Sequence, residues 1–168
     1  MNIFVTNNCP IKSAIILDDK RLVKMTLETT QLLSTTLSIL GSEKAPYKKT
    51  HKNHPCTIWV TESRGNYLWL LNHLQALLQE YTKRYNKIHK CQDYIEIFTN
   101  ESNLLTNNEL TPFKNVSYFK EDTTTDIIIL YQRTLVEKWL NNLSTTTWNK
   151  QHKNQEEILN LFPNIQDR

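Results

Sequence analysis

A charged row on one predicted helix is the feature of this sequence best suited to chemistry. Arg21, Lys24 and Glu28 are spaced by three and then four residues, which places their side chains on one face of an α-helix, and Gln31 extends that face by one turn. A carboxylate beside two cations can orient a nucleophile, accept a proton or stabilise a positive transition state next to a phosphate backbone. On spacing alone, a solvent-exposed ion pair between Lys24 and Glu28 is the more common explanation.

A basic segment that ends at Pro55 is the second candidate, and Arg64 is the third. The segment carries side chains of the types that contact phosphates and base edges: Lys49, His51, Lys52, Asn53 and His54. Solvated lysines in a Lys-rich chain would give the same cluster. Arg64 stands at the start of a predicted helix, where backbone N–H groups and the helix dipole favour an anion. The histidines of the segment lack the paired spacing of a metal site, so we expect no bound metal.

The composition limits the fold and the setting of the protein. Its 168 residues, 39% apolar and 22% charged, suit one globular domain over residues 1–168, and its two glycines argue against a Gly-rich phosphate loop. The three cysteines show no CxxC spacing, and the N-terminus has no basic signal-peptide region, so we expect a reduced, cytoplasmic setting. No apolar run reaches the length of a membrane span, so we expect no membrane contact. The net charge of +3 is mild, and nothing in the sequence indicates a cofactor.

Hydrophobic periodicity predicts three main helices and therefore a mostly α fold. The first spans residues 17–40 and carries the charged row, the second spans residues 63–86 and the third spans residues 124–142. The remaining predicted elements are short: an extended piece at 3–5, a helix or turn at 10–16, a loop at 42–55, a turn before the second helix, and a helix at 156–162. Residues 92–122 are mixed, and no long element is predicted there. We expect the first two helices to pack side by side, with the basic loop between them and the third helix across them.

The order of these pieces resembles a known family. The run from Leu17 to Val23, Leu-Asp-Asp-Lys-Arg-Leu-Val, with Glu28 following, resembles the first long helix of the pyrimidine-dimer DNA glycosylases of the bacteriophage endonuclease V type. In that helix a similar stretch precedes the catalytic glutamate by the same spacing. The later pieces are similar in order: a basic loop, a long leucine-rich helix, and a last helix followed by an aromatic segment at Trp148. Residues 19–87 are closer still to a group of small phage-type proteins.

The resemblance implies a compact α domain of three main helices that acts on nucleic acid, double-stranded DNA in particular. In this family a free N-terminal amine attacks the sugar and a glutamate stabilises the sugar cation and assists strand-breaking elimination. Carried over to this chain, Met1 would supply the amine, Glu28 the carboxylate, and Arg21 and Lys24 would lie near the sugar-phosphate. The implied function is that of a DNA glycosylase for a damaged or modified base, with AP-lyase activity.

Two positions depart from the family pattern. The glycosylases expose a small second residue after methionine removal, whereas residue 2 here is Asn2, whose bulk normally leaves Met1 in place. The nucleophile is therefore the amine of Met1 itself, Lys20 or Lys24, or the lyase chemistry is absent. Arg21 also stands where the glycosylases have histidine. Two other functions remain open: a non-catalytic phage module that binds nucleic acid or a host protein, and an enzyme of ribosyl transfer on a free nucleoside or nucleotide.

Overall fold

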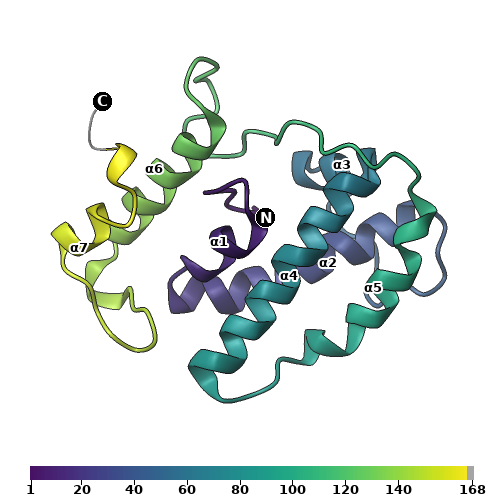
Figure 1. Ribbon diagram of the computed structural model, residues 1–168, viewed down its shortest axis with the longest axis horizontal. Helices are drawn as coiled ribbons and strands as arrows, with labels where there is room; N and C mark the ends of the chain where they lie inside the picture. The colour runs from purple at the N-terminus through teal and green to yellow at the C-terminus, as the bar shows by residue number, and fades with distance from the viewer. Residues whose placement is uncertain (166–168) are drawn as a thin grey trace.

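The computed structural model describes residues 1–165 and confirms a mostly α fold, with no strand in that range (Figure 1). The three predicted helices are α2 (Asp19–Ile39), α4 (Arg64–Tyr85) and α6 (Ile127–Leu140). Four shorter helices accompany them: α1 (Pro10–Ile15), α3 (Pro55–Glu62), α5 (Ile95–Glu101) and α7 (Gln155–Leu159). Single 3₁₀ turns occupy Lys90–Tyr94, Ser102–Leu104, Leu143–Thr145 and Pro163–Ile165.

Local sequence signals set the ends of the two longest helices. The Asp18 carboxylate accepts the backbone N–H of Arg21 at the start of α2, and Gly41, just past its end, has φ +85, which suits glycine. The Ser63 hydroxyl accepts the N–H of Asn66 at the start of α4, and Asn86 ends that helix in the left-handed conformation. These caps explain why the predicted bounds agree with the structure to within two residues.

Two predictions about short segments are wrong. Residues 55–62 form a helix rather than a turn, because the His54 ring caps its first turn and Pro55 occupies the first helical position, where proline is tolerated. Residues 3–5 are not extended throughout. Phe4 has φ +53 in the left-handed region, and the side chains of all three residues are buried.

The arrangement of the long helices matches the prediction only in part. Helices α2 and α4 pack side by side, with α1 against α4 and α3 against both. Helix α6 does not lie across this pair. It packs mainly on α7, and the N-terminal segment and α1 separate it from α4 (Figure 1). The reason is that Ile3, Phe4 and Val5 are buried and occupy the space that the prediction assigned to α6.

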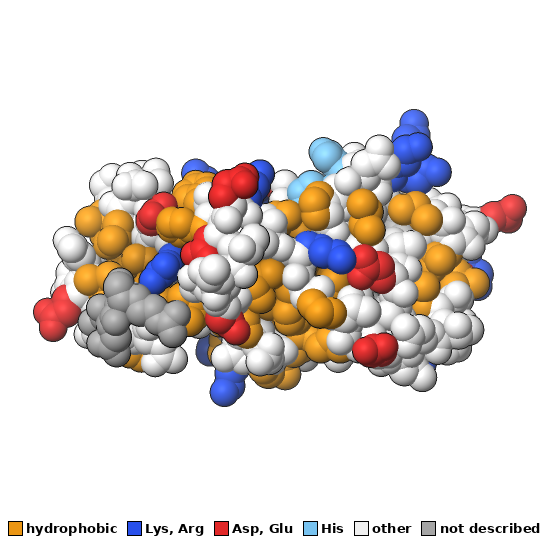
Figure 2. Space-filling model, turned by 90° about the horizontal axis from the view of Figure 1, so that it is seen from above, with side chains coloured by type: hydrophobic (Ala, Val, Ile, Leu, Met, Phe, Trp, Pro, Cys, Tyr) orange, Lys and Arg blue, Asp and Glu red, His pale blue; other side chains and the backbone are white. Residues whose placement is uncertain are grey.

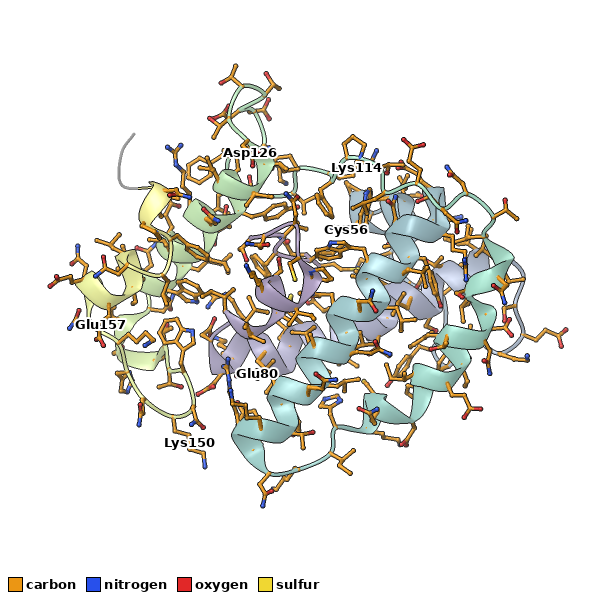
Figure 3. All side chains as sticks on the ribbon, in the orientation of Figure 1. Cys56, Glu80, Lys114, Asp126, Lys150 and Glu157 are labelled. Carbon is orange, nitrogen blue, oxygen red and sulfur yellow. The ribbon has the colours of Figure 1, made fainter. Side chains whose placement is uncertain are left out.

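One buried ion pair joins distant parts of the chain. The Arg84 guanidinium donates to the Asp19 carboxylate at 3.0 Å, to Glu80 at 2.7 Å, and to the backbone carbonyls of Leu17 and Ile15. The other donors to the Asp19 carboxylate come from the C-terminal part: the Thr147 hydroxyl and the backbone N–H groups of Asn149 and Lys150. Figure 3 shows Glu80 and Lys150 in the lower half of the view. The pair therefore connects the start of α2, the end of α4 and the loop before α7.

The hydrogen bonds to Asp19 outweigh the cost of burying its charge. Burial raises the pKa of this carboxyl. Hydrogen bonds from the N–H of Lys150, the Thr147 hydroxyl and the N–H of Asn149 lower the pKa by more than burial raises it, so it lies below its usual value. A carboxyl with a lowered pKa in the folded state stabilises the protein above its unfolded pKa, and that contribution is lost as the pH falls through the folded pKa.

We expect Asp19→Asn to lower the free energy of unfolding by about 3 kcal/mol near pH 7, because Arg84 would remain buried without its counter-charge. Urea unfolding followed by circular dichroism measures this change. The matched control is Glu43→Gln at an exposed position, which should alter stability by no more than about 0.5 kcal/mol. The difference between wild type and Asp19→Asn should also shrink below about pH 4, where Asp19 of the unfolded chain begins to take up a proton that the folded protein disfavours. A constant difference down to pH 2 would contradict this account of the ion pair.

Candidate active site

The N-terminal amine and the Glu28 carboxylate lie side by side. The Met1 nitrogen is 4.0 Å from Glu28 Oε2, and Lys24 Nζ is 3.6 Å from Glu28 Oε1, one helical turn away. The Met1 side chain is 4% exposed, the Glu28 side chain 17% and the Lys24 side chain 62%. Of the two residues that bring an amine beside the carboxylate, Met1 is therefore the one with the more enclosed side chain.

Contacts of the first five residues hold the amine in this position. Asn2 acts through both ends of its side-chain amide: Nδ2 donates to the Val116 carbonyl at 3.2 Å, and Oδ1 accepts the backbone N–H of Phe4 at 2.8 Å. The second contact closes a tight turn, which accounts for the positive φ of Phe4. A buried non-glycine residue in this conformation is strained, and such strain persists only where the surrounding packing enforces it.

The Glu28 carboxylate has two charged neighbours, but no hydrogen bond holds its Oε2 atom. Its Oε2 is buried and has no hydrogen-bond partner, and the Met1 nitrogen at 4.0 Å is just beyond hydrogen-bond range. Buried polar atoms without a partner are rare in folded proteins, so this atom needs an explanation. An oxygen in this state can accept a proton from an adjacent group without first breaking an existing bond.

A pocket of about 180 Å³ opens above the amine and the carboxylate. Its walls come from three separate parts of the chain: Met1, Asn2 and Phe4; Lys24, Met25 and Glu28; and Val116, Tyr118, Thr134 and Lys138. The last group includes side chains that sequence reasoning did not identify as site residues. Tyr118 lies in a stretch without periodicity, so no sequence signal pointed to it. The sequence placed Lys138 only within the third predicted helix and gave it no role.

Tyr118 and Lys138 interact with each other at the rim of this pocket. Lys138 Nζ lies 4.0 Å from the centre of the Tyr118 ring and contacts its hydroxyl, and the Tyr118 backbone N–H donates to the Thr134 hydroxyl at 3.0 Å. The tyrosine ring is 55% exposed. The rim of the pocket therefore presents one aromatic face and one cation.

The predicted charged row divides in the structure. Lys24 pairs with Glu28, whereas Arg21 turns toward the start of the helix and donates to Asp18 Oδ1 at 2.8 Å. Asp18 also accepts the indole N–H of Trp139 at 2.7 Å. Arg21 still lines a second pocket of about 200 Å³, next to the first, together with three lysines: Lys20, Lys24 and Lys138. A cluster of four cations therefore flanks the Glu28 pocket.

The basic loop lies along α2 beyond Glu28. The Thr35 hydroxyl donates to the Thr50 carbonyl and accepts the Thr50 backbone N–H. Thr35 lies seven residues, about two turns, past Glu28 on the same helix. Four predicted residues of this loop have exposed side chains: Lys49, His51, Lys52 and Asn53. Figure 2 shows histidine side chains close to Lys and Arg side chains along one edge of the molecule, the type of surface that phosphate contacts require.

The two histidines of the loop have different roles. His54 caps α3 through Nδ1, which accepts the N–H of Cys56 at 3.2 Å. Burial lowers the pKa of His54, the positive charge of the Met1 amine lowers it further, and the negative charge of Glu28 opposes both. His54 therefore lies within the electric field of the site. His51 is exposed with φ +50, and its Nδ1 lies 2.7 Å from the Thr50 hydroxyl.

Arg64 does not belong to this arrangement. It is not among the residues that line the Glu28 pocket, and its Nη1 donates to Asn108 Oδ1 at 3.2 Å. The backbone N–H groups of Arg64 and Gly65 both donate to the Asn107 carbonyl. The helix start that the sequence offered as an anion site is therefore occupied by the chain itself.

Two further structural findings concern residues 1–165. No helix in this range is long and apolar enough to cross a bilayer. Nor do three or more His, Cys, Asp or Glu side chains converge there in a way that would hold a metal ion.

Comparison with known proteins identifies a family that this chain matches. A family model described as pyrimidine dimer DNA glycosylase matches residues 1–93, more than half of the 168 residues. The matched range includes Met1, Glu28, the basic loop and all of α4, and it confirms the resemblance noted in the sequence. Tyr118 and Lys138 lie outside it. No curated protein and no solved structure matches the chain significantly.

The packing that positions Met1 can be tested through the cysteines. Cys56 lies under Ile3 and Val5, where burial raises the pKa of its thiol to about 12 (Figure 3). Cys91 is also buried, whereas Cys9 is partly exposed, and the backbone N–H groups of Lys12 and Ile11 lower its pKa. We expect a thiol reagent such as DTNB to modify one cysteine, Cys9, quickly in the native protein and all three after unfolding.

Ile3→Ala should accelerate modification of Cys56, because it loosens the cover over that thiol, whereas Ile11→Ala at an exposed position should not. Peptide mapping by mass spectrometry identifies the modified residue. Fast labelling of Cys56 in the wild type would show that the N-terminal segment does not cover α3, and the Met1 amine would then not be held beside Glu28.

Proposed function

The chain belongs to the pyrimidine dimer DNA glycosylase family, and on this basis we propose that it cleaves the N-glycosidic bond of a damaged pyrimidine in duplex DNA. The Met1 amine is the nucleophile and Glu28 is the catalytic carboxylate. The observation that carries this proposal is the 4.0 Å separation of the Met1 nitrogen from Glu28 Oε2 at the base of a pocket.

The first step replaces the base by the amine. A neutral Met1 amine attacks C1′ of the damaged nucleotide, the N–C1′ bond forms, and the glycosidic bond breaks. The base leaves with the bonding electrons and takes up a proton. Positive charge develops on the sugar in the transition state, and the nearby Glu28 carboxylate stabilises it. The C1′–O4′ bond then breaks, O4′ takes the bonding electrons and the remaining amine proton to become a hydroxyl, and an imine between Met1 and C1′ results.

The second step is a lyase reaction on this imine. The imine withdraws electrons from C2′, so a base can remove a C2′ proton. The electron pair forms the C2′–C3′ double bond while the C3′–O bond to the phosphate breaks, and water later releases the sugar from Met1. Glu28 Oε2, which has no competing hydrogen bond, is suited to accept the protons in both steps.

Enclosure favours Met1 over the two lysines as nucleophile. Its side chain is 4% exposed, whereas that of Lys24 is 62% exposed, and Lys20 lines only the neighbouring pocket. An amine next to a carboxylate can reach its neutral, reactive form by transferring a proton over a short distance. Asn2, which departs from the small residue of the family pattern, helps to hold this amine in place.

Duplex DNA fits the distribution of charge around the pocket. Lys20, Arg21 and Lys138 line the pocket beside it, and Lys49 and Lys52 are exposed in the loop along the same helix. Cations on both sides of a reactive centre can hold the phosphates on both sides of one nucleotide. Since the pocket is built from residues between Met1 and Lys138, most of the chain, we further propose that residues 1–168 act as a single catalytic domain.

We expect the wild type to form a covalent adduct with abasic duplex DNA when sodium borohydride is present, because borohydride reduces the imine to a stable amine. Glu28→Gln should lower the rate of adduct formation about 100-fold or more, since it removes the proton acceptor and the negative charge. Gel electrophoresis of labelled DNA measures the rate, and a duplex with a cyclobutane pyrimidine dimer tests the glycosylase step.

Two controls identify the nucleophile. Placing one glycine before Met1 converts the reactive amine into an amide and should abolish the adduct, whereas Lys24→Gln should retain most of it. Mass spectrometry of the digested adduct should find the sugar remnant on Met1. An adduct on Lys24 or Lys20 would overturn the assignment to Met1. If no DNA substrate gives cleavage or an adduct, and binding does not respond to Glu28→Gln, the protein is a binding module.

Lys138→Ala should weaken duplex binding and reduce the slope of log K against log salt by about one, because one phosphate contact is lost. The control is Lys12→Ala at an exposed position on α1, which should change neither quantity. Fluorescence anisotropy titrations at several salt concentrations provide both. An unchanged slope in Lys138→Ala would place the DNA elsewhere than over the pockets that Lys138 lines.

A further inference from the structure

The loop after α4 carries the most exposed large hydrophobic side chain of residues 1–165. Ile88 is 77% exposed, whereas the next in order, Tyr118 and Ile11, are 55% and 54% exposed. A single exposed isoleucine is common on protein surfaces and by itself needs no explanation. The position of Ile88 and the residues on either side of it are what make it informative.

The loop is anchored on both sides of Ile88. Asn86, with φ +51, ends α4 and donates its N–H to Thr82 at 2.8 Å. His89 accepts the N–H of Cys91 at 3.1 Å and packs edge-on against the Tyr81 ring at 4.9 Å, and Cys91 is buried. Burial lowers the pKa of His89, which favours the neutral ring that can accept this bond. Ile88 is therefore held outward by fixed neighbours.

A third pocket lies between this loop and the helix that carries the candidate catalytic carboxylate. A pocket of about 520 Å³ lies between His89 and Lys90 on one side and α2 on the other. The α2 wall includes Glu28 itself, together with Val23 and Leu27, which are about two-fifths exposed. Glu28 thus lines both this pocket and the one that contains the Met1 amine. A substrate seated over Glu28 would lie next to the loop.

The charges around Ile88 favour a polyanion as the partner. Lys87 and Lys90 stand on its two sides, and both are exposed. A duplex offers the complementary pattern, with a stack of apolar base faces between two rows of phosphates. Proteins that kink DNA use the same combination, an apolar side chain between base steps with cations on the flanking backbone.

We propose that Ile88 inserts into the base stack of duplex DNA beside the Glu28 pocket, while Lys87 and Lys90 bind the flanking phosphates. The inference rests on the proposed function, because it assumes that DNA is seated over Glu28. Insertion separates neighbouring base pairs and bends the duplex, which moves the target sugar out of the helix and toward the Met1 amine. Unstacking costs free energy, and the gain from burying Ile88 and neutralising phosphates offsets it.

The test is the fluorescence of 2-aminopurine placed next to an uncleavable abasic analogue (tetrahydrofuran) in a duplex. This base is bright when unstacked, so wild-type binding should increase its fluorescence. Ile88→Ala should lose most of the increase, and Ile88→Leu should keep it because the side chain has similar volume. Ile11→Ala, the matched exposed isoleucine on α1, should behave as the wild type does.

The rate of borohydride adduct formation supplies a second measurement. On abasic duplex DNA, Ile88→Ala should react about tenfold more slowly than the wild type, the effect of losing most of one buried isoleucine. On a single strand with an abasic site there is no duplex to open, so the two rates should agree. Full fluorescence in Ile88→Ala, or an equal loss of rate on both substrates, would overturn the insertion.

The two proposals fail in different ways. If the wild type forms no adduct on any substrate, the proposed chemistry is overturned, and the fluorescence signal still decides whether Ile88 enters the duplex. If adducts form normally on duplex DNA in both the wild type and Ile88→Ala, the proposed chemistry stands and the insertion is overturned.

Discussion

The buried ion pair between Asp19 and Arg84 is the constraint on which the rest of the structure depends. Asp19 is the first residue of α2, and Arg84 lies one residue before the end of α4, so the pair sets the position of one helix against the other. The loop at 147–150 closes over the same carboxylate. Burying two charges is favourable only when further hydrogen bonds satisfy them, and here both partners have such bonds. Glu28 lies on the helix whose start this pair fixes.

The N-terminal segment then determines what Glu28 faces. Its apolar residues fill the space between the helix pair and α6, and Asn2 ties its beginning to Val116. Phe4 accepts a strained backbone as a consequence. A residue larger than the family pattern at position 2 therefore has a structural use in this chain. Burial of three hydrophobic side chains supplies the free energy that holds one amine beside one carboxylate.

The surroundings of Glu28 have two sides with different chemistry. On one side Tyr118 and Lys138 form an aromatic and cationic rim over the Met1 amine. On the other side the loop with Ile88 rises beyond an apolar stretch of α2. A carboxylate between an aromatic ring and an exposed apolar side chain suits a substrate that is both planar and charged. Nucleotides within a duplex combine these two properties.

The sequence by itself determined the helices and the contacts within each helix. The hydrophobic repeat predicted the three long helices, and Ser63 and Asn86 predicted the bounds of α4. The spacing of four residues predicted the contact between Lys24 and Glu28. All of these interactions lie within a few residues along one helix. The short helix at 55–62 was missed because its cap is a histidine, a less usual capping residue. Only the tertiary structure decided the position of α6, the pair of Asp19 with Arg84, and the approach of Met1 and Tyr118 to Glu28. Periodicity shows which face of a helix is buried but not which element covers it. Contacts between residues far apart in the chain are therefore set by how the whole core packs.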